Sequence, residues 1–413
     1  MDNIFDDPAV LVEFSPKEQS DQQDLQVEVL DWFKDAAHVC PRVMKVVDLP
    51  SLDMPLVRVI LAPLDHPRSA YSESILYLAR LYSIPTAFLE ESIRSVTHSF
   101  GTREDGGFTS TWFHYVCKDL RIVKNDSQWG YKIIPQSGHP ALELQNADWT
   151  WSRSGFFLRY TAPEVTSRKP EVTLICFRAP PFLRRRLAQI PASTVCRSVA
   201  RDPHCLFVII LNELSGEMDT NSWKVANVFR GIETDLLGPH HQRESFTGLH
   251  NVFKHIIFLF ESTEAILLVL KSFSTHHQNL LDQAESTSAK ARLATQHALV
   301  QVETSFQAVH LRLKSLEKRM QNVISLSYHM VTQEGTQIMQ RDSSSMATIA
   351  LVTLVFLPIS TISADGFPGF LGVLDDFDSF DPRRGASVVP LDSPERFNPQ
   401  YWPSQKTDFN SFL

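Results

Sequence analysis

The feature that most constrains this chain is a heptad repeat in its C-terminal half. Residues that are apolar, apart from one serine, recur at alternating spacings of four and three, the pattern that packs one side of a helix against another helix. They are Val302, Phe306, Val309, Leu313, Leu316, Met320, Val323, Ser327 and Met330. Between Leu280 and Gln340 there is no proline and only one glycine, Gly335. This stretch therefore predicts one helix of roughly 90 Å at about 1.5 Å per residue.

The seam formed by these residues has two interpretations. In one, the helix packs against its own domain. In the other, it is an oligomeric stalk that pairs with further chains, because an uncovered seam would expose a long apolar stripe. We predict the stalk, within a helical region at residues 246–342, and keep intramolecular packing as the alternative.

The segment before the stalk contains several strand-like stretches. Aromatic and β-branched residues between turn-rich loops predict strands at 108–116, 155–160 and 172–177. The continuous apolar run CLFVIIL at 205–211 predicts a strand that is covered on both faces. The sequence thus predicts a sheet with a fully buried strand.

Helical patterns alternate with these strands. They are predicted at 181–189, at 218–236 and, as two helices separated by a break, over 72–98. Interleaved strands and helices are typical of an α/β domain. We therefore expect an N-terminal edge segment at residues 1–70 and an α/β cytosolic domain at residues 71–245.

Charge and cysteine content narrow the function classes. The net charge is −8 at pH 7, so no basic surface for nucleic acid is predicted. The five cysteines form no CxxC pair, which argues against a disulfide framework or a cysteine zinc site and for a reducing compartment. The acidic N-terminus lacks the regions of a signal peptide. We expect the bulk of the chain to be cytosolic.

The sequence offers no catalytic motif and only weak metal candidates. GxSxG, HExxH, GxGxxG and GxxxxGK[ST] are absent, so we predict no enzyme and no cofactor. Two pairs of adjacent histidines, His240-His241 and His276-His277, are the metal candidates. Adjacent residues of a helix point about 100° apart, and the neighbouring sequence offers no converging ligand. We therefore assign no metal ligands.

One segment has the character of a membrane helix. Residues 343–364, 22 in all, carry no charge, and about 20 apolar residues are needed to span a bilayer. The strongly apolar members together favour insertion by roughly 3 to 5 kcal/mol before the serine, threonine and proline penalties. We predict one transmembrane-type helix of marginal hydrophobicity. The alternative is a buried core helix that ends at Pro358.

The beginning of this segment resembles a known family. The run RDSSSMATIALVTLVFLP at residues 341–358 is similar to the entry of the first transmembrane helix in CorA-type magnesium transporters, especially the CorA-like proteins of fungi. The GFFLRY and VTLICF strands and the long helix resemble the cytosolic domain of that branch. The resemblance covers about residues 70 to 362 and is strongest from 300 onward.

The resemblance implies a homo-oligomer, a pentamer in that family, whose first membrane helix lines an ion path for Mg²⁺. The pore-facing residues it implies are Met346, Ile349, Thr353, Leu357 and Ser360. Their spacing is compatible with one helical stripe. Mg²⁺ enters only as a transported or regulatory ion, and the resemblance assigns no regulatory ligand here.

The chain also departs from the family pattern. The Gly-Met-Asn signature, or its aromatic-glycine variant, does not follow, and no second apolar helix is present. Residues 365–413 contain eight acidic residues, four basic residues and six prolines, so we expect a disordered tail. We therefore expect a transporter subunit with an incomplete, C-terminally truncated membrane region. The alternative is a soluble regulatory or interaction protein that is derived from the same cytosolic domain and uses the stalk to bind copies of itself or full-length relatives.

Overall fold

A computed structural model of the chain describes most of the region between residues 23 and 365. The described residues are 23–33, 41–63, 71–93, 98–120, 122–124, 131–133, 150–161, 171–190, 192–236, 244–283 and 286–365. The chain divides into a first unit, residues 1–324, and a second unit, residues 325–412. The predicted disordered tail lies outside the described residues, apart from its first residue, Asp365.

The first unit is built on a seven-stranded mixed sheet with the order β2-β1-β3-β9-β8-β5-β4. The bounds are β1 Gln26–Trp32, β2 Arg42–Lys45, β3 Val57–Ala62, β4 Ser99–Asp105, β5 Phe108–Asp119, β8 Thr150–Thr161 and β9 Val172–Phe177. Only the central pair β3 and β9 is parallel; the other pairs are antiparallel. A separate pair joins β6, Ile122–Lys124, to β7, Tyr131–Ile133. The strands predicted within β5, β8 and β9 are confirmed.

Three of the seven strands precede residue 71, where the domain was expected to begin. β3 lies between β1 and β9 in the middle of the sheet, and all six of its residues are buried. The strands β1, β2 and β3 therefore belong to the sheet itself and not to an edge segment. The apolar run of β3 is only six residues long and is flanked by Pro55 and Pro63. Prolines indicate turns and loops, so the sequence predicts no strand here.

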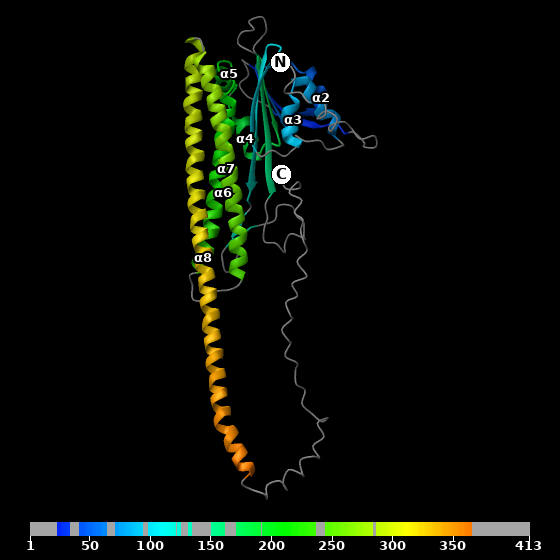
Figure 1. Ribbon diagram of the computed structural model, residues 1–413. Coiled ribbons are helices and arrows are strands. Elements are labelled where there is room, and N and C mark those ends of the chain that lie inside the picture. Colours follow the sequence, from blue (N-terminus) through cyan, green and yellow to red (C-terminus); the bar gives the residue numbers. More distant parts are fainter. Residues whose placement is uncertain are drawn as a thin grey trace. The chain divides into compact units, whose positions relative to one another are not determined.

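Helices cover the sheet on both faces (Figure 1). The 3-10 helix η1, Val46–Ser51, with α2, Ser72–Tyr82, and α3, Thr86–Ile93, packs on one face. The core on the other face contains residues of the remaining helices, which for α8 means residues before 325. These helices are α4 Pro181–Gln189, α5 Ala192–Val199, α6 Cys205–Leu236, α7 Glu244–Asp282 and α8 Ser286–Asp365. In β3, Val59 contributes to the core under α4–α8 and Ile60 to the core under α2 and α3, as the alternation of side chains along a strand requires.

The predicted strand at 205–211 is wrong, because these residues form the first two turns of α6. Leu206, Phe207, Ile210 and Leu211 are fully buried, whereas the residues between them are partly exposed. This spacing is helical, and α6 is apolar over much of its circumference here because it contacts the sheet and other helices. A short, continuous apolar run does not distinguish a buried strand from a buried helix. The helix predicted at 181–189 is confirmed as α4.

The seam is occupied within the chain. Its members from Val302 to Val323 are buried in the same core as residues of α6 and α7. Arg312 and Arg319 on α8 form ion pairs with Asp219 and Glu233 on α6. The seam therefore packs as in the intramolecular alternative, because α6 and α7 supply the apolar partners that the stalk interpretation assigned to other chains. Met330 lies in the second unit and is partly buried.

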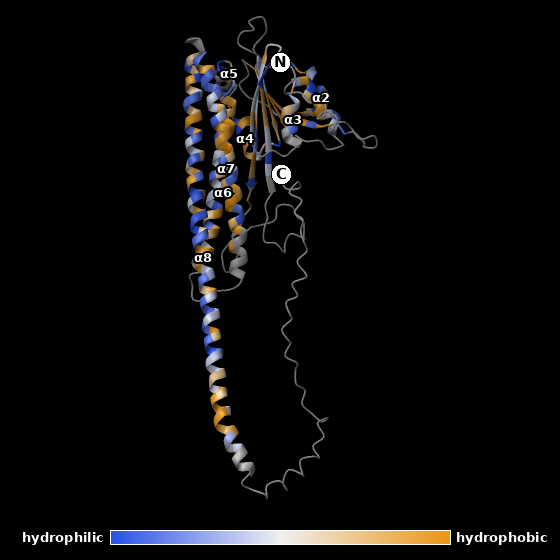
Figure 2. Ribbon diagram, viewed as in Figure 1, coloured by the Kyte–Doolittle hydropathy of each residue, from blue (hydrophilic) through white to orange (hydrophobic). Residues whose placement is uncertain are grey.

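The long helix itself is confirmed, since α8 runs for 80 residues and continues through Pro358 to Asp365. The alternative of a core helix that ends at Pro358 is therefore not observed. In the second unit, Figure 2 shows apolar residues gathered near the end of α8. Among the described residues, no helix combines the length and apolar character needed to cross a membrane. Residues 361–364 of the predicted membrane segment are helical, and their side chains lie outside the description.

Candidate functional site

Three buried side chains from two distant stretches of the sequence meet inside the first unit. Asp202 and His204 lie in the link between α5 and α6, and His277 lies near the end of α7, 75 residues beyond Asp202. Their exposed fractions are 2%, 2% and 0%. One potential ligand atom from each lies within 4.8 Å of the others. We call this set the Asp-His cluster.

The carboxylate of Asp202 is the centre of the cluster. Its Oδ2 lies 2.9 Å from His277 Nε2 and its Oδ1 lies 3.4 Å from His204 Nδ1. Oδ1 also accepts a hydrogen bond from the backbone N–H of His204 at 3.2 Å. This local bond is the kind that an aspartate makes at the start of a helix, and it fixes the carboxylate just before α6 begins.

A second layer of polar groups orients the two histidines. His277 Nδ1 lies 2.8 Å from Gln296 Oε1 on α8, and Gln296 Nε2 donates to Ser274 Oγ at 2.9 Å. His204 Nε2 lies 3.4 Å from Thr111 Oγ1 on β5. The cluster therefore connects the α5–α6 link to the sheet and to two long helices.

Burial and neighbouring charge shift the pKa values of Asp202 and His204 in opposite directions. Burial alone would raise the pKa of Asp202, but hydrogen bonds and charge from His204 and His277 outweigh it and hold that pKa well below its usual range. Burial lowers the pKa of His204, although Asp202 opposes this. The pKa of His276 falls to about 4, through burial and then through His204 and His277. The environment thus favours a charged carboxylate beside imidazole groups.

The sequence marks His276 and His277 as metal candidates but does not identify Asp202 and His204, which lie close to His277 in the structure. Only His277 belongs to the cluster, whereas the His276 ring centre lies 5.8 Å from that of His204. The converging groups come from the Asp-Pro-His tripeptide at 202–204. That tripeptide before an apolar helix is the one local signal, and it is a common pattern at helix starts. His240 and His241 lie outside the described residues.

The residues implied to line a pore all lie on α8 in the second unit. Met346, Ile349 and Leu357 are 71%, 65% and 57% exposed. Thr353 Oγ1 donates to the backbone oxygen of Ile349, and Ser360 Oγ to that of Leu357, each at 2.8 Å. The structure places the five residues on one helix, and their pore-facing role remains a prediction.

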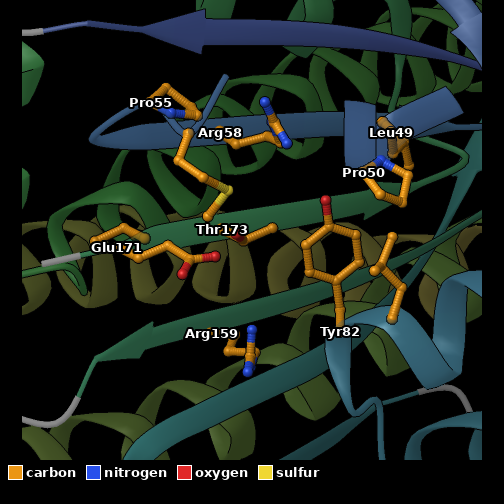
Figure 3. A pocket seen from close by; sticks show the side chains of 11 residues that line it. Leu49, Pro50, Pro55, Arg58, Tyr82, Arg159, Glu171 and Thr173 are labelled. Atoms are coloured by element: carbon orange, nitrogen blue, oxygen red, sulfur yellow. The ribbon is translucent and has the colours of Figure 1, made fainter. Parts of the chain in front are cut away.

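A small cavity of about 110 Å³ opens on the α2 side of the sheet (Figure 3). Arg58, Tyr82, Arg159 and Glu171 are among its lining residues. The Arg58 guanidinium is held by Asp31, with nitrogen–oxygen distances of 2.8 and 3.1 Å, and also donates to the backbone oxygen of residue 53 at 2.8 Å. Because these bonds hold Arg58 in the fold, we assign the cavity no ligand.

Comparisons with known proteins found solved structures that are similar to this chain, but no protein that is similar in sequence. No family model matches the chain, and no curated protein matches it. The complete CorA magnesium transporter from Methanocaldococcus jannaschii aligns with a TM-score of 0.45 at 12% identity, over 83% of this chain and 86% of that one. The full-length CmaX protein aligns with a TM-score of 0.45 at 12% identity, over 84% and 87%.

A third structure, the ZntB cytoplasmic domain from Vibrio parahaemolyticus, aligns with a TM-score of 0.42 at 8% identity. The alignment covers 75% of this chain and 100% of that domain. CorA-type structures are thus among the structural neighbours of the chain. At these scores and identities, the likeness assigns neither substrate nor mechanism.

Proposed function

We propose that this chain is a non-enzymatic subunit of a CorA-type divalent-cation transporter. The first unit is its cytosolic domain, and the end of α8 is the part that enters the membrane. The proposal rests on one observation, which is that the surface of α8 changes along its length from amphipathic to uncharged. α8 buries an apolar seam in the first unit, and the same helix then continues into an uncharged segment at residues 343–364.

The uncharged segment is apolar around its circumference. Leu354 and Phe356 are 73% and 64% exposed. Met346, which points in another direction from the helix, is 71% exposed, and Ile349 is 65% exposed. A helix that is apolar all round is stable only when lipid or other helices cover it. Lipid and copies of the same segment together would provide that cover in a membrane-embedded oligomer.

The packing of the seam limits which surfaces of the chain can form an oligomer. Because α6 and α7 already cover the seam residues up to Val323, self-association must use other surfaces. The uncharged segment is an apolar surface that would gain from contact with further copies. We therefore place the oligomer contact in the membrane segment and propose a homo-oligomer, a pentamer by the resemblance of residues 341–358 to the family.

The ion path would follow the stripe Met346, Ile349, Thr353, Leu357 and Ser360. Apolar side chains alternating with small hydroxyls form a constriction that opens by wetting. Mg²⁺ loses its water shell reluctantly, so a pore that leaves the shell in place suits it. The hydroxyls of Thr353 and Ser360 are bonded to the helix backbone, which leaves their oxygens able to accept hydrogen bonds from the waters around the ion.

The second candidate is a soluble regulatory protein that self-associates. The observation that favours it is the marginal hydrophobicity of the segment, which contains Thr353, Pro358 and Ser360 among its apolar residues. In this case the exposed apolar residues of α8 pair with other protein chains rather than with lipid. Both candidates share the fold and differ in whether α8 contacts lipid.

Membrane extraction distinguishes the two candidates. We expect the full chain to resist carbonate extraction and the variant Leu354→Arg to be released, because arginine at the centre of a membrane helix costs about 2.5 to 3.5 kcal/mol. Leu311→Arg is the matched control, since Leu311 is a 65% exposed leucine of the same helix in the first unit. Equal release of the unmodified chain and both variants would favour the soluble protein. Mg²⁺ uptake into vesicles that contain the purified chain then tests transport.

A further inference from the structure

We propose that Asp202, His204 and His277 bind a divalent transition-metal ion of the Zn²⁺ type inside the first unit. This site is separate from the ion path of the proposed function and does not depend on it. Its three donors come from the α5–α6 link and from α7. Each offers a ligand atom, and these atoms lie within 4.8 Å of one another.

The donor set selects the class of metal. Two imidazole nitrogens and one carboxylate oxygen suit Zn²⁺ and related transition metals. Mg²⁺ prefers oxygen ligands and water, so two imidazoles are a poor site for it. The site is therefore expected to discriminate against the ion that the proposed pore would carry.

The distances are close to those of a metal site. Ligands about 2.0 to 2.1 Å from a tetrahedral Zn²⁺ are roughly 3.3 Å from one another. The Asp202 oxygens lie 2.9 Å from His277 Nε2 and 3.4 Å from His204 Nδ1. The two imidazole nitrogens lie within 4.8 Å of each other, so the histidines would move closer together around an ion, and a water molecule would complete the tetrahedron.

The orientation of His277 supports the proposal independently of these distances. Gln296 Nε2 donates to Ser274 Oγ, and Gln296 Oε1 therefore lies 2.8 Å from His277 Nδ1. In the tautomer whose Nδ1 carries the hydrogen, the lone pair of His277 Nε2 faces the Asp202 carboxylate, and the two groups can hold a cation between them. At 2.9 Å, Nε2 and the carboxylate oxygen share either a proton, as a hydrogen bond, or a metal ion. Metal-binding histidines are held in this way, by a hydrogen bond from the ring nitrogen that does not bind the metal.

Either a proton or a metal ion can be that cation. With a proton, the cluster is a buried ion pair that joins the α5–α6 link to α7. With a metal ion, the same residues become ligands, and through Gln296 and Thr111 the ion is coupled to α8 and β5. A metal ion that binds the folded chain alone stabilises it. The experiment must therefore separate metal binding from ion pairing.

Metal titration of the purified full chain, after removal of metals by a chelator, makes this separation. We expect one Zn²⁺ per chain in calorimetry, and visible absorption bands of four-coordinate Co²⁺ when Co²⁺ is used as the probe. A large excess of Mg²⁺ should not displace either ion. Asp202→Asn and His277→Gln should remove this binding, and Gln296→Leu should weaken it by about 10- to 100-fold.

His255→Gln is the matched control, because His255 is a buried histidine of the same helix, α7, and is not part of the cluster. It should bind Zn²⁺ as the unmodified chain does. X-ray absorption of the bound Zn²⁺ should show nitrogen and oxygen ligands and no sulfur. Sulfur ligands, an unchanged affinity in Asp202→Asn, or the lack of saturable binding would each overturn the proposal.

Ligand variants of a buried cluster can lose their fold, so the unmodified chain supplies a second measurement. Its Tm should rise with Zn²⁺ and stay constant with Mg²⁺, whereas Gln296→Leu should show a smaller rise at the same Zn²⁺ concentration. Equal Tm values with and without Zn²⁺ would contradict the metal site and leave the buried ion pair as the role of the cluster.

Discussion

The Lys118 ammonium nitrogen lies 3.4 Å from the centre of the Phe258 ring, which joins β5 to α7 inside the first unit. The Lys118 side chain is buried. Burial, and then the charge of nearby Lys254, lower its pKa to about 7, while Glu261 opposes the shift. The aromatic face offers a cation partial compensation for lost water. Because burial lowers the pKa of Lys118 in the fold, this residue makes the stability of the first unit dependent on pH.

Between pH 7 and 10.5 the unfolded chain holds a proton on Lys118 that the folded chain does not. The free energy of unfolding should therefore rise with pH across this window, by at most about 1.4 kcal/mol per pH unit from this group. Urea unfolding at several pH values measures the slope. Lys118→Met should flatten it, whereas Lys271→Met, an exposed lysine of α7, should leave it unchanged. Identical slopes in all three proteins would contradict the prediction.

A buried ion pair should contribute more to stability than an exposed one in the same sheet. Arg58 and Asp31 pair on adjacent strands with side chains 5% and 7% exposed. Removing one partner by Asp31→Ala should cost about 3 to 5 kcal/mol, because the guanidinium stays buried without its carboxylate. Lys45→Ala breaks the exposed pair with Asp24 and should cost less than about 1 kcal/mol. Similar losses in urea unfolding would show that burial is unimportant here.

Gly101 on β4 should tolerate no side chain. A Cβ there would overlap the buried ring of Trp112 on β5. Gly101→Ala should therefore destabilise the first unit by about 1 to 3 kcal/mol. Gly216→Ala is the control on α6, where a Cβ meets nothing within 4 Å, and it should stabilise the helix by up to about 1 kcal/mol. Thermal melting of both variants checks the opposite signs.

The occupied seam leads to a stability prediction. Leu313 is fully buried, so Leu313→Ala should cost about 2 to 5 kcal/mol of unfolding free energy. Leu311→Ala, at an exposed position of the same helix, should cost less than about 0.5 kcal/mol. Urea unfolding gives both values, and light scattering shows whether the oligomeric mass changes. A loss of mass without a loss of stability in Leu313→Ala would instead support the oligomeric stalk.

The sequence by itself determined those features that depend on local periodicity. The long helix followed from the heptad spacing and from the lack of proline between Leu280 and Gln340. The strands within β5, β8 and β9 followed from their β-branched and aromatic residues. The uncharged segment at 343–364 was likewise visible as composition. Each of these signals is contained in one continuous stretch of chain.

The tertiary structure decided which surfaces meet. The apolar run at 205–211 lies in a helix that contacts the sheet and other helices, although its composition also suits a buried strand. The seam packs on α6 and α7 of the same chain. The Asp-His cluster needed Asp202 and His277, which are 75 residues apart and converge only when α7 returns along α6. Apolar burial is non-directional, so a pattern shows that a face will be covered, and only the folded chain shows by what.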